Sequence, residues 1–311
     1  MQNSTLSQLY TFTIRKFSLI YTLLAVVALS ACSSVSEQED RDFGVNSLET
    51  ELYAQASDLI ESSQYTAASQ FLQTMEARFP FGAFAEQGQL DLIYSYYQSG
   101  QIDAAIATAD RFIRLHPEHP DADYAYYMRG LISFDQENSF VGDFLPLDIT
   151  KRDPGSARES FGYFSEFLAR FPDSEYVADS RKRMIYLRNI LARHEINVAN
   201  YYFGRGAYLA ATNRGRYVVE NFQGSPAVPD GLAIMAQGYT LLGMTELAQN
   251  SIDVLEINYP EHPALDEEGD FIARDIAAGL QRSWVNKLTF GILDQPEPLG
   301  YDTRDMYNPS P

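Results

Sequence analysis

The single cysteine of the chain, Cys32, stands where bacteria attach a lipid to exported proteins. Arg15 and Lys16 precede a mostly apolar run over residues 17–29, and two small residues then lead directly into the cysteine. A positive flank, a short apolar run and small residues before a cleavage point are typical of a signal peptide. The run is also too short for a stable membrane span. The pattern predicts that residues 1–31 are cleaved and that Cys32 carries an S-diacylglycerol and an N-acyl chain.

The predicted lipid also limits the other chemistry of the chain. With Cys32 acylated, no thiol remains for a disulfide or a cysteine-based metal site, and we expect no cofactor besides the covalent lipid. Residues 1–31 hold two bases and no acids, so their removal changes the formal net charge from −19 to −21. Nucleic acid and anionic headgroups are poor partners for so acidic a protein. The alternative interpretation is an uncleaved signal anchor in which the cysteine has no role.

The residues after Cys32 predict where the protein is held. In many bacteria with two membranes, an aspartate directly after the lipidated cysteine retains a lipoprotein at the inner membrane. Ser33 is not an aspartate, so the resemblance to this rule implies an outer-membrane anchor with the protein body on the periplasmic side. Residues 32–46 are polar, acidic and without clear periodicity, which is typical of a flexible tether.

The remaining residue types that could do chemistry form no convincing catalytic or metal site. His116 and His119 flank Pro117 in a loop between predicted helices. The proline prevents a helical presentation of two ligands and no third ligand is evident, so a solvated turn is the better interpretation. His194 stands on a helix, where a contact on the helix face is more common than a catalytic base. We find no phosphate loop, nucleophile elbow or zinc motif, and predict that the protein is not an enzyme.

The elements that must position any binding residues repeat along the chain. Five segments end in a similar way, each with an aromatic residue or a histidine next to last, and their last residues are Pro80, Pro117, Pro172, Gln223 and Pro260. Twelve positions before each ending stands a small residue: Ala68, Ala105, Ser160, Ala211 and Ala248. Five positions before each ending stands an apolar residue: Met75, Phe112, Phe167, Val218 and Leu255. Agreement at fixed offsets in five segments indicates one structural unit used five times.

The offsets suit pairs of helices. A small residue allows two helices to cross closely, and an apolar residue seven positions later lies on the same face. Proline then ends the second helix of the pair. The pattern resembles the tetratricopeptide repeat family, which implies an all-α solenoid of about five helix–turn–helix repeats over residues 47–260. The third unit has an insertion at about 137–153, the fourth has a long first helix at roughly 176–203, and residues 261–311 form a C-terminal extension.

Two groups of side chains are candidates for binding partners. The sequence holds 21 Tyr and 19 Phe, and adjacent aromatic residues on a helix cannot all face the core. Some must therefore reach the concave face that such solenoids offer to peptides. Basic residues are scarce but gather on the fourth repeat, which suggests a docking surface for an acidic partner. The alternative for both groups is core packing and ordinary solvated faces.

Three stretches resemble the BamD family of lipoproteins in the outer-membrane β-barrel assembly machinery. They are residues 78–82 (Arg-Phe-Pro-Phe-Gly), residues 148–154 within the insertion, and residues 187–207 in the fourth repeat. The resemblance covers roughly residues 25–260. It implies a non-enzymatic scaffold that receives the targeting segments of unfolded outer-membrane proteins and docks the barrel subunit BamA, alongside other assembly lipoproteins.

Candidate residues follow from combining the resemblance with the repeat pattern. A targeting segment with alternate aromatic residues suits a tyrosine-lined groove, for which we predict Tyr53, Tyr65, Tyr94 and Tyr97. For docking BamA we predict Arg188, Glu195 and Arg205. Two other functions stay open at this point: a repeat lipoprotein that organises other envelope or peptidoglycan-associated proteins, and an envelope hydrolase with an unrecognised site.

Overall fold

The computed structural model describes residues 49–139, 148–274 and 301–303. Cys32, the predicted signal peptide and the predicted tether lie outside the described residues. Within the described ranges the regular elements are helical, and none of the helices is both long and apolar enough to cross a membrane. In chain order they are α2 (Glu49–Glu61), α3 (Tyr65–Arg78), α4 (Ala85–Gln98), α5 (Ile102–Leu115), α6 (Ala122–Ser139), the 3₁₀ turn η2 (Ile149–Lys151), α7 (Gly155–Arg170), α8 (Val177–Phe203), α9 (Tyr208–Asn221), α10 (Val228–Leu241) and α11 (Thr245–Asn258).

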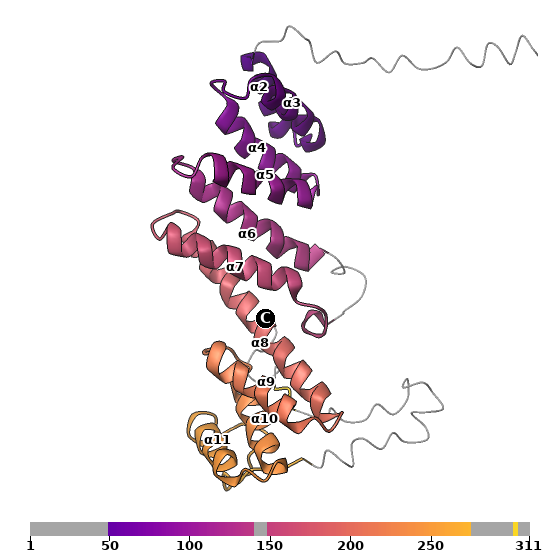
Figure 1. The fold of residues 1–311 in the computed structure, drawn as a ribbon, viewed down its shortest axis with the longest axis vertical. Helices are drawn as coiled ribbons and strands as arrows, with labels where there is room; N and C mark the ends of the chain where they lie inside the picture. The colour runs from indigo at the N-terminus through magenta and orange to yellow at the C-terminus, as the bar shows by residue number, and fades with distance from the viewer. Residues whose placement is uncertain (1–48, 140–147, 275–300, 304–311) are drawn as a thin grey trace, which may run out of the picture.

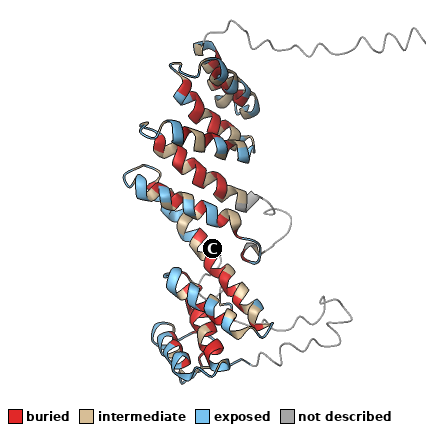
Figure 2. Cartoon of the chain, in the orientation of Figure 1, coloured by how far each residue is buried: buried red, intermediate tan, exposed pale blue. Residues whose placement is uncertain are grey.

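These helices form five consecutive pairs that stack into one elongated superhelix (Figure 1). Each helix packs mainly against the helix before it and the helix after it. Buried residues follow the helix faces that meet inside the stack, from the first pair to the last (Figure 2). The all-α solenoid with five tetratricopeptide-like repeats that the sequence predicts is therefore confirmed.

The two sets of repeat positions lie in the core, as their spacing predicts. The small residues Ala68, Ala105, Ser160 and Ala211 are fully buried and Ala248 is nearly so; the apolar residues Met75, Phe112, Phe167, Val218 and Leu255 are buried as well. The serine that replaces alanine in the third repeat is satisfied, because the Ser160 hydroxyl donates to the carbonyl oxygen of Gly130 at 2.9 Å. A buried hydroxyl therefore costs little there.

Glycine closes the turns inside three of the pairs. Gly100, Gly206 and Gly243 have φ of 75°, 71° and 71°, a conformation that other residues adopt only with strain. Another glycine pair lets α9 and α10 approach each other closely. A Cβ on Gly215 of α9 would lie 2.7 Å from the carbonyl oxygen of Gly231 on α10, so these two helices can touch only because both residues lack a side chain.

Helix α8 connects the two halves of the solenoid. It contains 27 residues, which corresponds to a length of about 40 Å. Leu187 in its first half packs with Phe164 of α7, whereas Ile196 and Phe203 in its second half belong to the core of the last two repeats. The inserted segment of the third repeat reaches the same helix, because Asn197 donates to the hydroxyl and carbonyl oxygens of Thr150 at 2.8 and 3.1 Å.

The described part of the C-terminal extension covers the last repeat. After α11 the chain turns back on itself, with a single bridge between Leu265 and Phe271. Both residues pack against the core cluster of α8 to α11, as does Tyr301. This segment occupies the end of the stack, where a further repeat would otherwise bury the apolar face. Residues 275–300 and 304–311 lie outside the described residues.

The repeat register can be tested by overfilling one helix crossing. We expect Ala211→Leu to lower the free energy of unfolding by about 1–3 kcal/mol, because Ala211 is fully buried where α9 meets its neighbours and added methylenes force the helices apart. Ala54→Leu is the matched control, since Ala54 is an exposed position of α2, and it should stay within about 0.5 kcal/mol of wild type. Urea denaturation followed by circular dichroism measures both. Equal stability of the two variants would contradict the register.

Candidate functional site

The first helices of successive pairs form the inner face of the superhelix. Helices α4 and α6 contact each other directly, as do α8 and α10, and among the described elements no two second helices touch to the same extent. Elements that lie closer together mark the inside of a curved stack. We call the surface formed by α2, α4, α6 and the start of α8 the tyrosine face, because tyrosine side chains join these helices.

Tyr53 links the first two repeats on the tyrosine face. Its hydroxyl donates to Oδ2 of Asp91 on α4 at 2.9 Å, and its ring stacks on Phe84 with 4.6 Å between ring centroids. Burial, together with the charge of Asp91, raises the pKa of Tyr53 to about 12. Burial also raises the pKa of Asp91, although hydrogen bonds from Gln87 and Tyr53 act in the opposite direction.

The same type of contact recurs between the next repeats. The Tyr97 hydroxyl of α4 donates to Asp135 of α6, and the Tyr127 hydroxyl of α6 donates to Oδ2 of Asp179 on α8 at 2.9 Å. Arg183 joins the two contacts, because its guanidinium lies 2.5 Å from Asp179 and 3.9 Å from Asp135. A tyrosine of one first helix therefore bonds a carboxylate of the next first helix three times in succession.

Charges and burial in this network keep both partners in a defined protonation state. Burial raises the pKa of Tyr127 to about 12, with a further contribution from the hydrogen bond to Asp179. Burial also raises the pKa of Tyr97. For Asp179 burial alone would raise the pKa, but hydrogen bonds from Arg183 and Tyr127 lower it overall. The phenols therefore stay neutral near pH 7 while Asp179 stays ionised.

Tyr65 and Tyr94 lie beside each other at the end of the tyrosine face that belongs to the first two repeats. Their rings meet edge to face with 5.7 Å between centroids. Tyr65 stands at the start of the second helix α3, and its hydroxyl is 3.4 Å from the Ser63 hydroxyl. All four tyrosines that the sequence singles out are partly exposed, so their ring edges reach the surface of the inner face.

The tyrosine face can bind an extended segment through rings and carboxylates. The phenol hydroxyls of Tyr53, Tyr97 and Tyr127 donate to aspartates within the chain, so they are not free to donate to a partner. The aspartate oxygens have further lone pairs and can accept hydrogen bonds from backbone N–H groups, and the exposed ring edges can pack against apolar side chains.

The sequence analysis did not single out five residues of this face: Tyr127, Asp91, Asp135, Asp179 and Arg183. The sequence did contain a signal for these contacts. Tyr53 and Asp91 are 38 residues apart, as are Tyr97 and Asp135, and this separation is one residue more than the 37 residues from Pro80 to Pro117.

The residues proposed for docking have different environments. Arg188 donates to the carbonyl oxygens of Gln223 and Gly224 at 3.2 and 2.9 Å, which fixes α8 to the turn before α10. Glu195 is buried and pairs with Arg214 of α9 at 2.8 Å. The structure therefore places both side chains in contacts within the chain, where they hold α8 against the helices that follow it.

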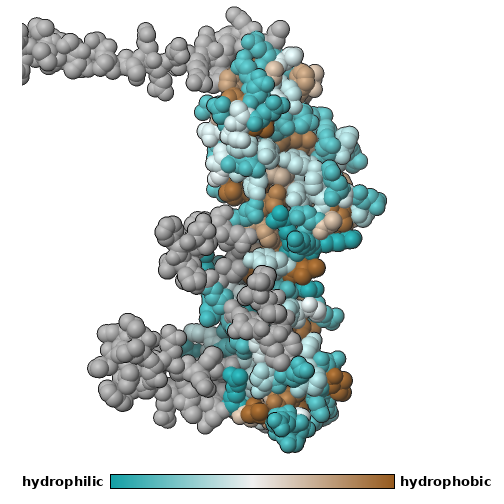
Figure 3. Space-filling view, turned by 180° about the vertical axis from the view of Figure 1, so that it is seen from behind, coloured by the Kyte–Doolittle hydropathy of each residue, from teal (hydrophilic) through white to brown (hydrophobic). Residues whose placement is uncertain are grey.

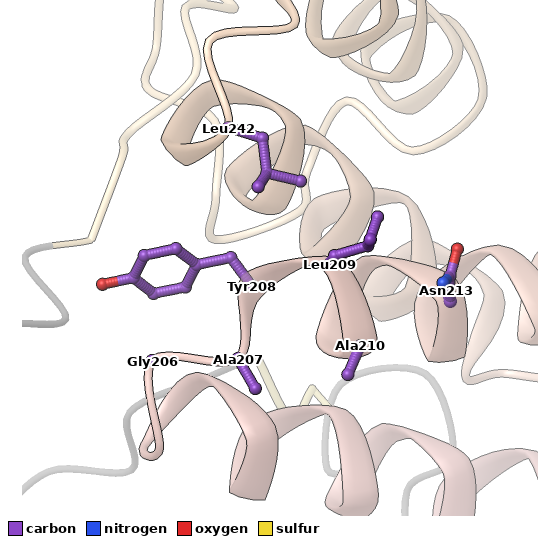
Figure 4. Close-up of a pocket in the computed structure, with 7 residues that line it drawn as sticks. All are labelled: Gly206, Ala207, Tyr208, Leu209, Ala210, Asn213 and Leu242. Carbon is purple, nitrogen blue, oxygen red and sulfur yellow. The ribbon is translucent and has the colours of Figure 1, made fainter.

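Arg205 alone among the three lies on an open surface. It is exposed at the turn between α8 and α9, and its guanidinium carbon is 5.2 Å from the centre of the Tyr201 ring, itself 58% exposed. A hollow of about 520 Å³ begins at the next residue and is lined by Gly206, Ala207, Tyr208, Leu209, Ala210, Asn213 and Leu242. In Figure 4 Leu209 points from α9 toward Leu242 at the end of α10. A cation beside an apolar hollow suits an acidic and apolar partner.

Other parts of the described chain offer weaker candidates. His116 and His119 both face the Glu86 carboxylate, at 3.0 and 3.3 Å, and the described residues hold no cluster of three or more ligands arranged for a metal. His194 contacts the carbonyl oxygen of Thr150 at 3.0 Å. The face shown in Figure 3 is mostly hydrophilic, and its hydrophobic residues lie in separate spots.

Five stacked helix pairs with a tyrosine-lined inner face define a tetratricopeptide-like repeat protein. The profile of the YfiO family, described as outer membrane lipoprotein, matches residues 46–255. The chain therefore belongs to this family of outer membrane lipoproteins, of which BamD proteins are members, and the resemblance found in the sequence is confirmed.

The relatives match along almost their whole length. The outer membrane protein assembly factor BamD of Neisseria meningitidis serogroup A is 41% identical over 252 residues, which cover 79% of this chain and 93% of that protein. The BamD proteins of Xylella fastidiosa strain Temecula1 and Vibrio cholerae are each 33% identical, and cover 80% and 78% of this chain and 85% and 99% of their own lengths.

Proposed function

We propose that this protein is a non-enzymatic scaffold of the outer-membrane β-barrel assembly complex. It binds a BamA-like barrel subunit and receives the targeting segments of unfolded outer-membrane proteins. The observation that carries the proposal is the 41% identity to an outer membrane protein assembly factor along 93% of that relative's length. The five-repeat solenoid is consistent with this role, because such folds bind extended partners over a long inner surface.

The tyrosine face is the proposed site for the targeting segment. An extended segment with alternate aromatic residues presents side chains to one side and backbone N–H groups along its edge. The rings of Tyr65 and Tyr94 offer apolar edges, and Asp91 and Asp135 offer carboxylate oxygens close to Tyr53 and Tyr97. This surface would give aromatic anchors together with backbone acceptors.

The surface around Arg205 is the proposed docking site for BamA. Its exposed guanidinium and the apolar hollow beside it can meet an acidic side chain and an apolar one on the partner. Arg188 and Glu195 support this docking by positioning, because they attach α8 to the turn before α10 and to α9. Attachment to the outer membrane is assigned to the lipid on Cys32, with the repeats on the periplasmic side beside other assembly lipoproteins.

An affinity purification with matched variants tests the docking proposal. We expect Arg205→Glu to lower recovery of the barrel subunit from detergent extracts about tenfold, because reversing an interface charge places like charges together. Arg114→Glu is the control, since Arg114 is exposed at the end of α5, two repeats away along the chain. Mass spectrometry of co-eluting proteins and circular dichroism complete the measurement.

Two results would contradict the proposal. Unchanged recovery of the barrel subunit with Arg205→Glu, or an equal loss with Arg114→Glu, would exclude the Arg205 surface as the docking site. Recovery of cell-wall or peptidoglycan-associated proteins in place of a barrel subunit would transfer the function to a different kind of envelope scaffold and leave the fold unchanged.

A further inference from the structure

A three-residue segment from the C-terminal extension lies against the inner side of α8 and α10. Tyr301, Asp302 and Thr303 come back to the solenoid after α11 has ended the last repeat (Figure 1). They bond to residues more than 60 positions earlier in the chain. We call the residues of α8, α10 and the loop after α11 that hold this segment the tail cradle; they are Arg193, Asn200, Asp230, Gln237 and His262.

Tyr301 fills the apolar part of the tail cradle. Its side chain is 1% exposed, and its ring lies 6.1 and 6.2 Å from the rings of His262 and Phe271. Its hydroxyl is 3.2 Å from the amide oxygen of Gln237. Its backbone carbonyl accepts a hydrogen bond from the side-chain amide of Asn200 at 3.1 Å. The cradle therefore contacts the ring, the phenol and the backbone of this residue.

The next two residues meet buried charges. Nη1 of Arg193 lies 3.1 Å from Oδ1 of Asp302. The backbone N–H and the hydroxyl of Thr303 each donate to a carboxylate oxygen of Asp230 at 3.0 Å. Asp230 is fully buried and the Arg193 side chain is 6% exposed, so their hydrogen-bonding capacity must be met inside the protein.

The polar groups of the tail cradle match the segment one by one. A buried ion pair is costly unless further hydrogen bonds satisfy both partners. Here Arg193 and Asp230 pair with each other, and the segment supplies one carboxylate to the arginine and two donors to the aspartate. Simple burial of an apolar face would need none of these contacts. Such complementarity is typical of a site that recognises a peptide sequence.

We propose that α8 and α10 form a recognition site for an extended peptide of aromatic–acidic–threonine sequence, and that the protein's own Tyr301–Asp302–Thr303 is its resident ligand. While the segment is bound, the inner side of α10 is closed to other extended partners. The tyrosine face on α2, α4, α6 and the start of α8 stays open, because none of its tyrosine–aspartate contacts involves the segment. A partner segment with the same three side-chain types would compete for the cradle.

A peptide with the chain's own sequence provides the probe. The full-length chain carrying Tyr301→Ala is mixed with a fluorescein-labelled peptide of residues 299–305, and binding is followed by fluorescence anisotropy. We expect this variant to bind the peptide at least tenfold more tightly than wild type, in which the segment of the same chain competes at an effective concentration of order millimolar. Adding Asn200→Ala to the variant should weaken peptide binding severalfold, because Asn200 donates to the Tyr301 carbonyl.

A second variant covers the case in which loss of the Tyr301 ring disturbs the last repeat. Asp302→Asn keeps the ring and the shape of the carboxyl group but removes the charge that faces Arg193. We expect at least threefold tighter peptide binding than in wild type with an unchanged circular dichroism spectrum. A peptide with alanine in place of tyrosine should bind neither variant. Wild-type levels of binding in both variants, or equal binding of the alanine peptide, would overturn the proposal.

Discussion

Replacing Asp230 with alanine should lower the free energy of unfolding by about 3–5 kcal/mol, because it leaves the buried Arg193 without its main partner. Asp230 is fully buried and accepts hydrogen bonds from Arg193 and Thr303, and it faces the His262 ring at 3.2 Å. The substitution removes all of these acceptors at once. Urea denaturation at pH 7 measures the change, and a loss below about 1 kcal/mol would contradict the assigned role.

Asp253→Ala provides the control for the Asp230 variant. Asp253 is exposed on α11 and bonds only Gln249 of the same helix among the contacts described. Its replacement should change the free energy of unfolding by no more than about 0.5 kcal/mol. A similar loss in both variants would show that the effect comes from removing negative charge in general and not from the buried network.

The pH dependence of stability should identify the same carboxylate. Burial tends to raise the pKa of Asp230, but the contacts with His262, Arg193 and Thr303 lower it overall below its usual value of 3.8. A depressed pKa in the folded state contributes stability that is present above the unfolded pKa and is lost as the pH falls below it. We therefore expect wild type to lose stability more steeply than Asp230→Ala as the pH falls below about 4.

Replacing Cys32 with alanine should release the protein from the membrane completely. Two or more acyl chains hold a protein stably, at about 0.8 kcal/mol per buried methylene, whereas a protein body with an acidic net charge gains nothing from anionic headgroups. Without the thiol no diacylglycerol can be attached. Fractionation of cells, with radiolabelled palmitate to follow acylation, measures the change.

Ser34→Ala is the matched control for the lipid prediction, because it alters a neighbouring small residue and keeps the thiol. This variant should stay in the outer-membrane fraction with full acylation. A Cys32→Ala protein that still incorporates radiolabelled palmitate, or a wild-type protein that incorporates none, would refute the lipid assignment and would favour an uncleaved signal anchor.

The repeat architecture could be predicted from the sequence because helix pairing is a local property. The small residue and the apolar residue at fixed offsets, such as Ala211 and Val218, lie on the same face of one helix, so their spacing alone reports the crossing. The turn glycines Gly100 and Gly243 and the long helix α8 follow from patterns of the same short range. Family membership was also present in the sequence, because similarity to relatives extends over most of the chain.

The roles of the polar residues were harder to predict, because they depend on which helices become neighbours. Glu195 and Arg188 lie on the same helix, α8. Only the packing shows that Glu195 is buried against Arg214 and that Arg188 bonds the turn before α10. The sequence pointed to Tyr53, Tyr94 and Tyr97 on the first helices, but it did not point to Tyr127 or to the carboxylate partners on the next first helix. Whether two residues of different repeats come within hydrogen-bond distance depends on the angle between the stacked repeats. The sequence of a single helix does not reveal that angle.

The sequence by itself determined the helix pairs, their order and the predicted site of lipid attachment, because each depends on residues within a few turns of one another. Only the tertiary structure decided that Tyr97 meets Asp135, that Arg205 stays exposed beside an apolar hollow, and that Tyr301 returns to α10. These contacts join residues far apart in the chain. Their geometry follows from the curvature of the whole stack, which sums small rotations between successive repeats.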